Sequence, residues 1–191
     1  MLSAKALEEK LKILPVLPFS QTSYRLIHAK YYQTSLSAIG SRMFAGRYNP
    51  KEQFEVLYLS DSPITALQEV NAIFRSSSQL FPVKDIPRIL LSIECQLTKV
   101  LDLTDDKIVS ELKTSFQELT GSWLLYSKDS LAPTQLLGKA CFESGIIEAL
   151  KVPSAQDPRA FNLAIFPERL QENSRIQVFD DSGFIDAVIE G

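Results

Sequence analysis

The chain of 191 residues has little of the chemistry that marks several common classes of protein. It contains two cysteines, Cys95 and Cys141, and a single histidine, His28, so neither a disulfide framework nor a cysteine–histidine zinc site is indicated. Apolar runs such as Ile89-Leu90-Leu91 are far too short to cross a membrane. We therefore expect a protein with no metal site and no membrane association.

The charge balance argues against a nucleic-acid-binding protein, and the N-terminal residues argue against a secreted one. Lysine and arginine number 20 against 23 aspartate and glutamate, which gives a net charge of −3 and no basic footprint for nucleic acid. The N-terminal MLSAKALEEKLK carries acidic residues and an amphipathic pattern in place of the apolar core of a secretory signal. These features favour a cytoplasmic protein that does not bind nucleic acid directly.

The composition is that of an ordinary globular domain, with 45% hydrophobic and 23% charged residues. Residues 31–51 show no clean period and are predicted to form a long loop. The strands do not alternate regularly with long helices, so we predict an α+β fold with mixed central sheets flanked by helices. The predicted helices are 3–13, 63–74, 105–119 and 133–145, and the predicted strands are 23–28, 54–60, 88–94, 99–103, 146–152, 161–166 and 175–180.

The segment GRYNPKEQFEVLYLSDSPITALQEV, residues 46–70, holds an arginine, an aromatic and a carboxylate on one strand–helix unit. Arg47, Tyr58 and Glu69 together suit an anionic, ribose-bearing ligand. Each also has an ordinary interpretation: a solvated turn arginine, a core tyrosine and a solvated helix glutamate. On a helical wheel Glu69 lies about 140° from the centre of the apolar stripe that begins at Ile64, and this angle does not decide between solvent and a cleft.

Two further candidates flank this segment. Arg25 lies in a predicted strand, where it is either a solvated residue or a guanidinium fork for phosphate. Ser154 resembles a turn serine, and no GxSxG sequence surrounds it to indicate a serine hydrolase. His28 is interpreted as a strand residue, and the acidic cluster at 102–106 as a helix cap.

In this order the candidates resemble the RES domain, a family named for its arginine, glutamate and serine. The resemblance covers roughly residues 22–180, so we divide the chain into an N-terminal helix and lead-in segment at 1–21 and a RES domain at 22–191, a single globular domain overall. Two departures are Tyr48, where the family often has tryptophan, and Ala45-Gly46, where a double glycine is usual. The matching pieces are YRL with Arg25, GRYNP with Arg47, VLYLSDSPITALQEV with Tyr58 and Glu69, and VPSAQDPRAFNLAIFPERL with Ser154.

This resemblance implies an ADP-ribosyltransferase-like fold and a bacterial toxin that consumes NAD⁺ by hydrolysis or phosphorolysis of its nicotinamide–ribose bond. It implies catalytic roles for Glu69, Arg25 and Ser154, and NAD⁺ contacts for Arg25, Arg47, Tyr58 and Ser154. NAD⁺ would be the substrate, with no other cofactor and no metal. The implied partners are an Xre-type helix-turn-helix antitoxin and a second copy in a homodimer. A protein ADP-ribosyltransferase and a non-catalytic nucleotide-binding module are the alternatives.

Overall fold

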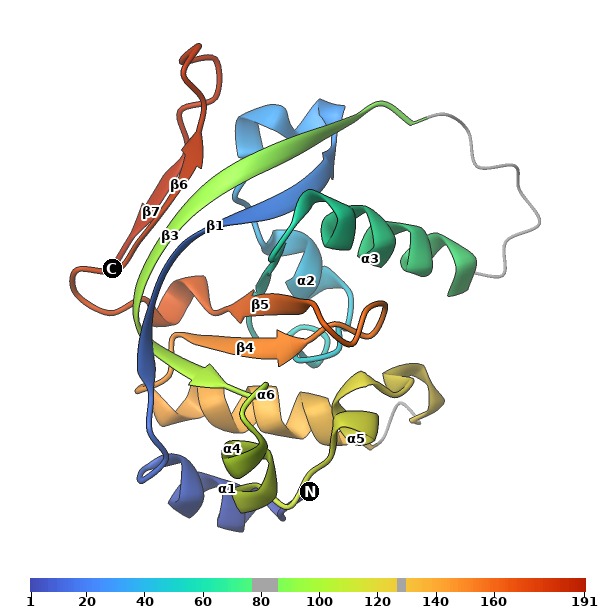
Figure 1. The fold of residues 1–191 in the computed structure, drawn as a ribbon, viewed down its shortest axis with the longest axis vertical. Coiled ribbons are helices and arrows are strands. Elements are labelled where there is room, and N and C mark those ends of the chain that lie inside the picture. The colour runs from blue at the N-terminus through green and yellow to red at the C-terminus, as the bar shows by residue number, and fades with distance from the viewer. Residues whose placement is uncertain (77–85, 127–129) are drawn as a thin grey trace.

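A computed structural model describes residues 1–76, 86–126 and 130–191, and it shows a strongly curved central sheet with helices packed against it (Figure 1). The predicted α+β fold with flanking helices is confirmed. The strands are β1 (Leu17–His28), β2 (Leu57–Ser60), β3 (Arg88–Asp102), β4 (Ala149–Pro153), β5 (Phe161–Ile165), β6 (Arg175–Phe179) and β7 (Val188–Glu190). The helices are α1 (Ala4–Leu11), α2 (Ile39–Met43), α3 (Pro63–Ser76), α4 (Asp106–Glu111), α5 (Phe116–Thr120) and α6 (Pro133–Ser144), with short 3₁₀ helices η1 (Ala29–Thr34), η2 (Trp123–Leu125) and η3 (Pro167–Arg169).

The strand order is β1-β2-β5-β4-β3-β6-β7, and β1 also pairs with β3, so the first five strands of this order close into a ring. The β1–β2 contact that completes the ring is narrow, with Tyr24 opposite Ser60 as its register pair. The β3–β4 pair is parallel and the other pairs are antiparallel, which makes the sheet mixed. The β6–β7 hairpin extends from the outer edge of β3 (Figure 1).

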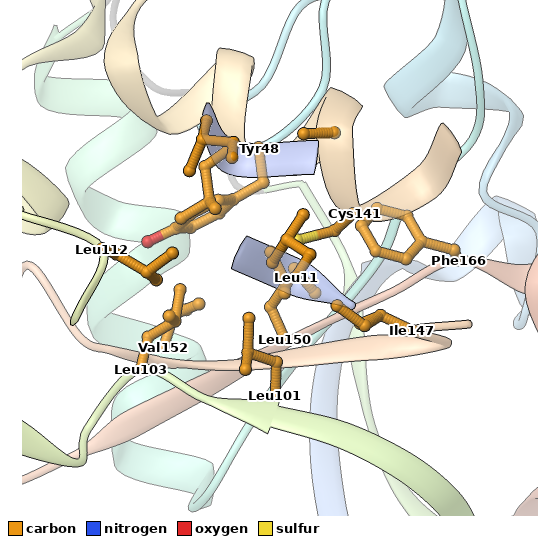
Figure 2. Close-up of a cluster of buried hydrophobic side chains, with 14 of the residues drawn as sticks. Leu11, Tyr48, Leu101, Leu103, Leu112, Cys141, Ile147, Leu150, Val152 and Phe166 are labelled. Carbon is orange, nitrogen blue, oxygen red and sulfur yellow. The ribbon is translucent and has the colours of Figure 1, made fainter. Parts of the chain in front are cut away.

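Two hydrophobic cores lie on opposite faces of β2, β4 and β5. Because strand side chains alternate, Leu57 and Leu59 of β2 face one core while Tyr58 packs against the other. Figure 2 shows the core on the Tyr58 face, where side chains from α1 and α6 meet those of β3 and β4. Leu7 and Leu11 of α1 are buried in it, so the lead-in segment contributes to the same core as the rest of the fold.

The helices beginning near residues 3 and 133 form as predicted, and α6 ends at Gly145, whose φ of 66° is in the left-handed region that glycine favours. The continuous helix predicted at 105–119 is wrong. Lys113 has a φ of 49°, which ends α4 and turns the chain before α5. Ser115 then caps α5, with its hydroxyl oxygen accepting a hydrogen bond from Glu118 N.

Two strand and loop predictions are also corrected. The segments 88–94 and 99–103 belong to one long strand, β3, which changes partners between β6 and β4. At that change Glu148 N donates to Lys99 O, and the buried Glu148 carboxylate accepts from Lys99 N, so both backbone groups of Lys99 stay paired. Residues 31–51, predicted as loop, contain most of η1 and all of α2.

Helix α3 forms where predicted but turns a different face to the sheet. The apolar stripe through Ile64 and Leu67 was expected to face the core, yet these side chains are 69% and 48% exposed. Thr65 and Ala66 are buried instead. Glu69 lies one helical turn after Thr65, and it is therefore carried toward the sheet and not toward solvent.

Within the described residues, no helix is long and apolar enough to span a membrane. The same part of the chain contains no group of three or more histidine, cysteine or acidic side chains arranged to hold a metal ion. The acidic cluster at 102–106 acts as predicted: Asp105 caps α4 by accepting from Lys107 N at 2.8 Å. His28 closes β1 and accepts from Lys30 N through Nδ1 at 3.1 Å.

Candidate functional site

The central feature of the site is the Glu69 carboxylate, which is held through one oxygen. Ser154 Oγ donates to Glu69 Oε1 at 2.7 Å, and Asn162 Nδ2 donates to the same Oε1 at 2.7 Å. Among the described residues no hydrogen bond reaches Oε2, and this oxygen is not one of the buried polar atoms left without a partner. The carboxylate is thus fixed through Oε1, and Oε2 has no hydrogen-bond partner in the part of the chain that the structure describes.

Three separate segments meet at this carboxylate. Ser154 follows directly after β4, and Asn162 is the second residue of β5, which pairs with both β4 and β2. Ser60, the last residue of β2, lies opposite Asn162 and donates to its Oδ1 at 2.8 Å. Because α3 begins three residues after Ser60, its Glu69 lies over the ends of these strands.

The Ser154 hydroxyl has a defined direction. Its oxygen accepts from Gln156 N at 3.0 Å and from Asp157 N at 3.3 Å, so the hydroxyl proton is directed at Glu69. The side chain is also buried, at 1% exposure. Ser154 is thus a turn residue, as one interpretation predicted, and the same turn directs its hydroxyl at Glu69.

Tyr58 organises a second network, in the loop at residues 46–49. Its hydroxyl accepts from Tyr48 N at 3.0 Å and donates to Asn49 Oδ1 at 2.8 Å. Burial raises the pKa of Tyr58 above its ordinary value, and the hydrogen bond from Tyr48 N and the charge of Arg47 offset only part of that effect. The hydroxyl therefore stays protonated at physiological pH and keeps its role as donor to Asn49.

The same loop is closed from the helical side by α6. Gln135 Nε2 donates to Gly46 O at 3.0 Å, and a Cβ on Gly138 would lie 1.9 Å from Tyr48 O. The loop backbone thus touches α6 directly, which explains a glycine inside that helix. Tyr48 itself is 1% exposed in the core shown in Figure 2, so the aromatic ring at this position is a packing residue.

We expect Gly46→Ala to lower the free energy of unfolding by about 1–3 kcal/mol, because a Cβ would overpack a closed site. That Cβ would lie 2.3 Å from Asn49 Oδ1 and 2.9 Å from the Tyr58 hydroxyl. Urea unfolding of the purified variant measures the loss. Gly40→Ala is the matched control, since nothing lies within 4 Å of its added Cβ and its helical position favours alanine. Equal stability of the two variants would contradict the close approach.

The two arginines occupy different parts of the molecule. Arg47 Nη1 donates to Leu119 O and Gly121 O at the C-terminal end of α5, where a cation complements the helix dipole. Arg25 Nη1 donates to Ser35 O at 2.8 Å, and both Nη atoms donate to Ser37 O at 3.1 Å. Burial lowers the pKa of Arg25 to about 10, which leaves it charged at physiological pH.

The five residues singled out from the sequence do not share one contact network. Glu69 and Ser154 are in direct contact, whereas Arg47 belongs to the loop at 46–49 and Tyr58 is hydrogen-bonded to that loop. Arg25 neighbours Tyr24, which faces Ser60 across the β1–β2 contact, so strand alternation directs Arg25 to the other face. Its hydrogen bonds confirm this, because they reach the segment that supplies Leu36 to the core on that face.

Sequence reasoning missed Asn162 and Ser60, which complete the surroundings of Glu69. The available signal was an asparagine inside the apolar run FNLAIF, where a polar residue in a buried strand needs a partner. That partner is Ser60, which lies 102 residues earlier in the chain. Only the register of β2 on β5 identifies it.

The family model of the RES domain matches residues 22–183 of the chain. The chain belongs to the RES domain family. The match begins inside β1 and ends just beyond β6, so it contains Glu69, Ser154, Asn162 and Ser60. The family resemblance seen in the sequence is thereby confirmed.

The fold of this RES protein is also found in a solved structure. A chain in the crystal structure of the M. tuberculosis MbcT–MbcA toxin–antitoxin complex aligns with a TM-score of 0.73 and 24% sequence identity. The alignment covers 92% of this chain and 90% of that chain, so the likeness includes the whole architecture and not a single motif. A search among curated proteins gives no match.

Proposed function

We propose that this RES protein is the toxin of a toxin–antitoxin pair and that it cleaves the nicotinamide–ribose bond of NAD⁺ by hydrolysis or phosphorolysis. The observation that carries the proposal is the Glu69 carboxylate, fixed through Oε1 by two donors while Oε2 has no hydrogen-bond partner among the described residues. An ordinary solvated glutamate on a helix does not need two hydrogen-bond donors from different strand segments to hold one of its oxygens. Membership of the RES family, with its implied NAD⁺ chemistry, supplies the substrate class.

The chemistry suits an anchored carboxylate. Cleavage breaks the bond between ribose C1′ and the nicotinamide nitrogen, and the electron pair leaves with nicotinamide, which departs as a neutral ring and needs no general acid. Positive charge then develops on the ribose in an oxocarbenium-like transition state. Glu69 Oε2 would face that charge or a ribose hydroxyl beside it. Because its position is fixed before reaction, little reorganisation is needed as the charge develops.

The acceptor completes the reaction by bonding its oxygen to C1′. With water the product is ADP-ribose, and the water proton is released to solvent. With inorganic phosphate the product is a phosphorylated ADP-ribose. With a protein side chain the same bond cleavage would make the protein an ADP-ribosyltransferase, which is the alternative enzyme class.

The pyrophosphate of NAD⁺ needs cationic donors, and Arg47 is the better placed of the two arginines. Only its Nη1 is used by the carbonyls at the end of α5, so Nε and Nη2 have no partner among the described residues. Arg25 has both Nη atoms engaged with backbone carbonyls. We therefore assign Arg47 to phosphate binding, and we assign Arg25 to holding the segment 35–37 that borders its strand. Tyr58 would act through the loop that carries Arg47.

The proposal is tested by incubating the purified protein with NAD⁺, with and without inorganic phosphate, and resolving the products by mass spectrometry. We expect nicotinamide release, with ADP-ribose in the phosphate-free sample or a phosphorylated ADP-ribose that appears only with phosphate. Tight NAD⁺ binding with no nicotinamide over hours would instead support a non-catalytic nucleotide-binding module. Transfer of ADP-ribose to added protein would support the transferase.

The toxin assignment has its own test in cells. Induced expression of the chain alone should lower cellular NAD⁺ and arrest growth, and co-expression of a helix-turn-helix antitoxin encoded beside it should restore both. Unchanged NAD⁺ and growth would remove the toxin assignment even if purified protein cleaves NAD⁺. The partner class follows from the family, as does pairing with a second copy of the chain, which sedimentation of the purified protein would test.

A further inference from the structure

Two consecutive hydrogen bonds lead from Ser60 through Asn162 to Glu69. Ser60 Oγ donates to Asn162 Oδ1 at 2.8 Å, and Asn162 Nδ2 donates to Glu69 Oε1 at 2.7 Å. An asparagine amide has an acceptor end and a donor end, and an ionised carboxylate can only accept, so Nδ2 faces Glu69. Oδ1 is then left facing Ser60, whose hydroxyl donates to it and supports this orientation of the amide.

The backbone that carries Ser60 and Asn162 is held in the β2–β5 ladder. Ser60 and Asn162 are directly opposed in the β2–β5 ladder, so their separation is set by two backbones and not by side-chain rotation. Ser60 is 5% exposed, and the next residues along β5 are buried in the sheet. By contrast Glu69 projects from α3, and its side chain is only partly buried. A long glutamate side chain in that setting has several rotamers, and its hydrogen bonds select one.

We propose that Ser60 and Asn162 are a positioning pair for Glu69, in which Ser60 acts only through the Asn162 amide. Asn162 fixes Oε1 jointly with Ser154, and Oε2 keeps no hydrogen-bond partner among the described residues. The pair is not assigned to contact the substrate. The kinetic consequences rest on the proposed NAD⁺ cleavage, whereas the geometric relation holds for the free protein.

The kinetic test is a double-mutant cycle. Asn162→Ala should lower kcat about 10- to 100-fold, the range for losing a hydrogen bond to a charged group, with KM for NAD⁺ nearly unchanged. Ser60→Ala should lower kcat less, and the double variant should be no slower than Asn162→Ala alone, since serine acts through asparagine. If the losses in kcat multiply in the double variant, Ser60 does not act through Asn162. Wild-type kcat in Asn162→Ala would contradict the proposal that the two residues position Glu69.

An isosteric variant separates donation from packing. Asn162→Asp keeps the shape but puts a second carboxylate against Glu69 in place of a donor. If the side chain positions Glu69 by donating, kcat should fall at least as far in Asn162→Asp as in Asn162→Ala. If it merely fills space, aspartate should be the milder change, and that order would overturn the assignment. Backbone amide spectra that match the wild type show that each variant is folded.

A readout without substrate keeps the inference separate from the proposed function. The side-chain amide resonance of Asn162 in a ¹H–¹⁵N spectrum is identified by its loss in Asn162→Ala. It should shift in Ser60→Ala and in Glu69→Gln, and it should stay in place in Ser20→Ala, an exposed serine on β1. An unmoved resonance in the first two variants overturns the positioning pair. Absent NAD⁺ turnover with the expected shifts would overturn only the proposed function.

Discussion

We expect Glu69→Gln to lower kcat for NAD⁺ cleavage by about 100- to 1000-fold, the effect of removing one well-placed electrostatic contact from a transition state, about 2.7–4 kcal/mol. The amide oxygen of glutamine can take the place of Oε1 and accept from both Ser154 and Asn162. Its nitrogen then occupies the place of Oε2, so the negative charge and the open acceptor are lost while the fold is kept.

Steady-state kinetics with NAD⁺ measures this loss, and thermal unfolding of the same sample checks stability. Glu8→Gln is the matched control, because it makes the same chemical change on the exposed surface of α1. It should retain wild-type kcat. A Glu69→Gln variant that kept more than about a tenth of wild-type kcat would contradict the electrostatic role, because it would correspond to less than about 1.4 kcal/mol.

The second large effect concerns stability and arises at Glu148, a fully buried carboxylate that is not one of the groups around Glu69. We expect Glu148→Gln to lower the free energy of unfolding by about 3 kcal/mol. Oε1 accepts from Thr98 N and Lys99 N, and Oε2 accepts from Gln171 N at 2.9 Å. An amide can satisfy only one side, and its NH₂ then opposes a backbone N–H on the other.

Urea unfolding monitored by circular dichroism measures this change. Glu172→Gln is the control, since Glu172 is exposed and follows Gln171 directly. A loss below about 0.5 kcal/mol for Glu148→Gln, the ordinary range of a surface substitution, would mean that the carboxylate is dispensable. A loss near the expected value would be a substantial share of the whole stability of a domain of this size.

Glu148 also explains one limit of the sequence prediction. The sequence predicted two separate strands, at 88–94 and 99–103, yet β3 runs through the residues between them. The strand leaves its pairing with β6 at Gln96 and enters its pairing with β4 at Val100. Between these ladders the backbone N–H groups of Thr98 and Lys99 donate to the Glu148 side chain, a contact at a sequence separation that local patterns do not record.

Helix α3 gives the second example. Periodicity placed its apolar stripe against the core and left Glu69 undecided, whereas Ile64 is exposed and Glu69 faces the strand ends. The break between α4 and α5 is different in kind. It was recoverable, because Ser115 followed three residues later by Glu118 is a helix-start signal in the sequence itself.

By itself the sequence determined the α+β class and most of the elements, because turn residues, caps and strand patterns are local. Its resemblance to the RES domain, and not any local pattern, gave the family and singled out Glu69 and Ser154 as candidates. Only the tertiary structure decided that Glu69 faces the strand ends and that Asn162, itself bonded to Ser60, donates to it. It also decided that Arg25 lies on the other face of β1. These facts depend on strand register and on which helix face packs against the sheet. Both are set by contacts between residues far apart in the chain, which no local pattern encodes.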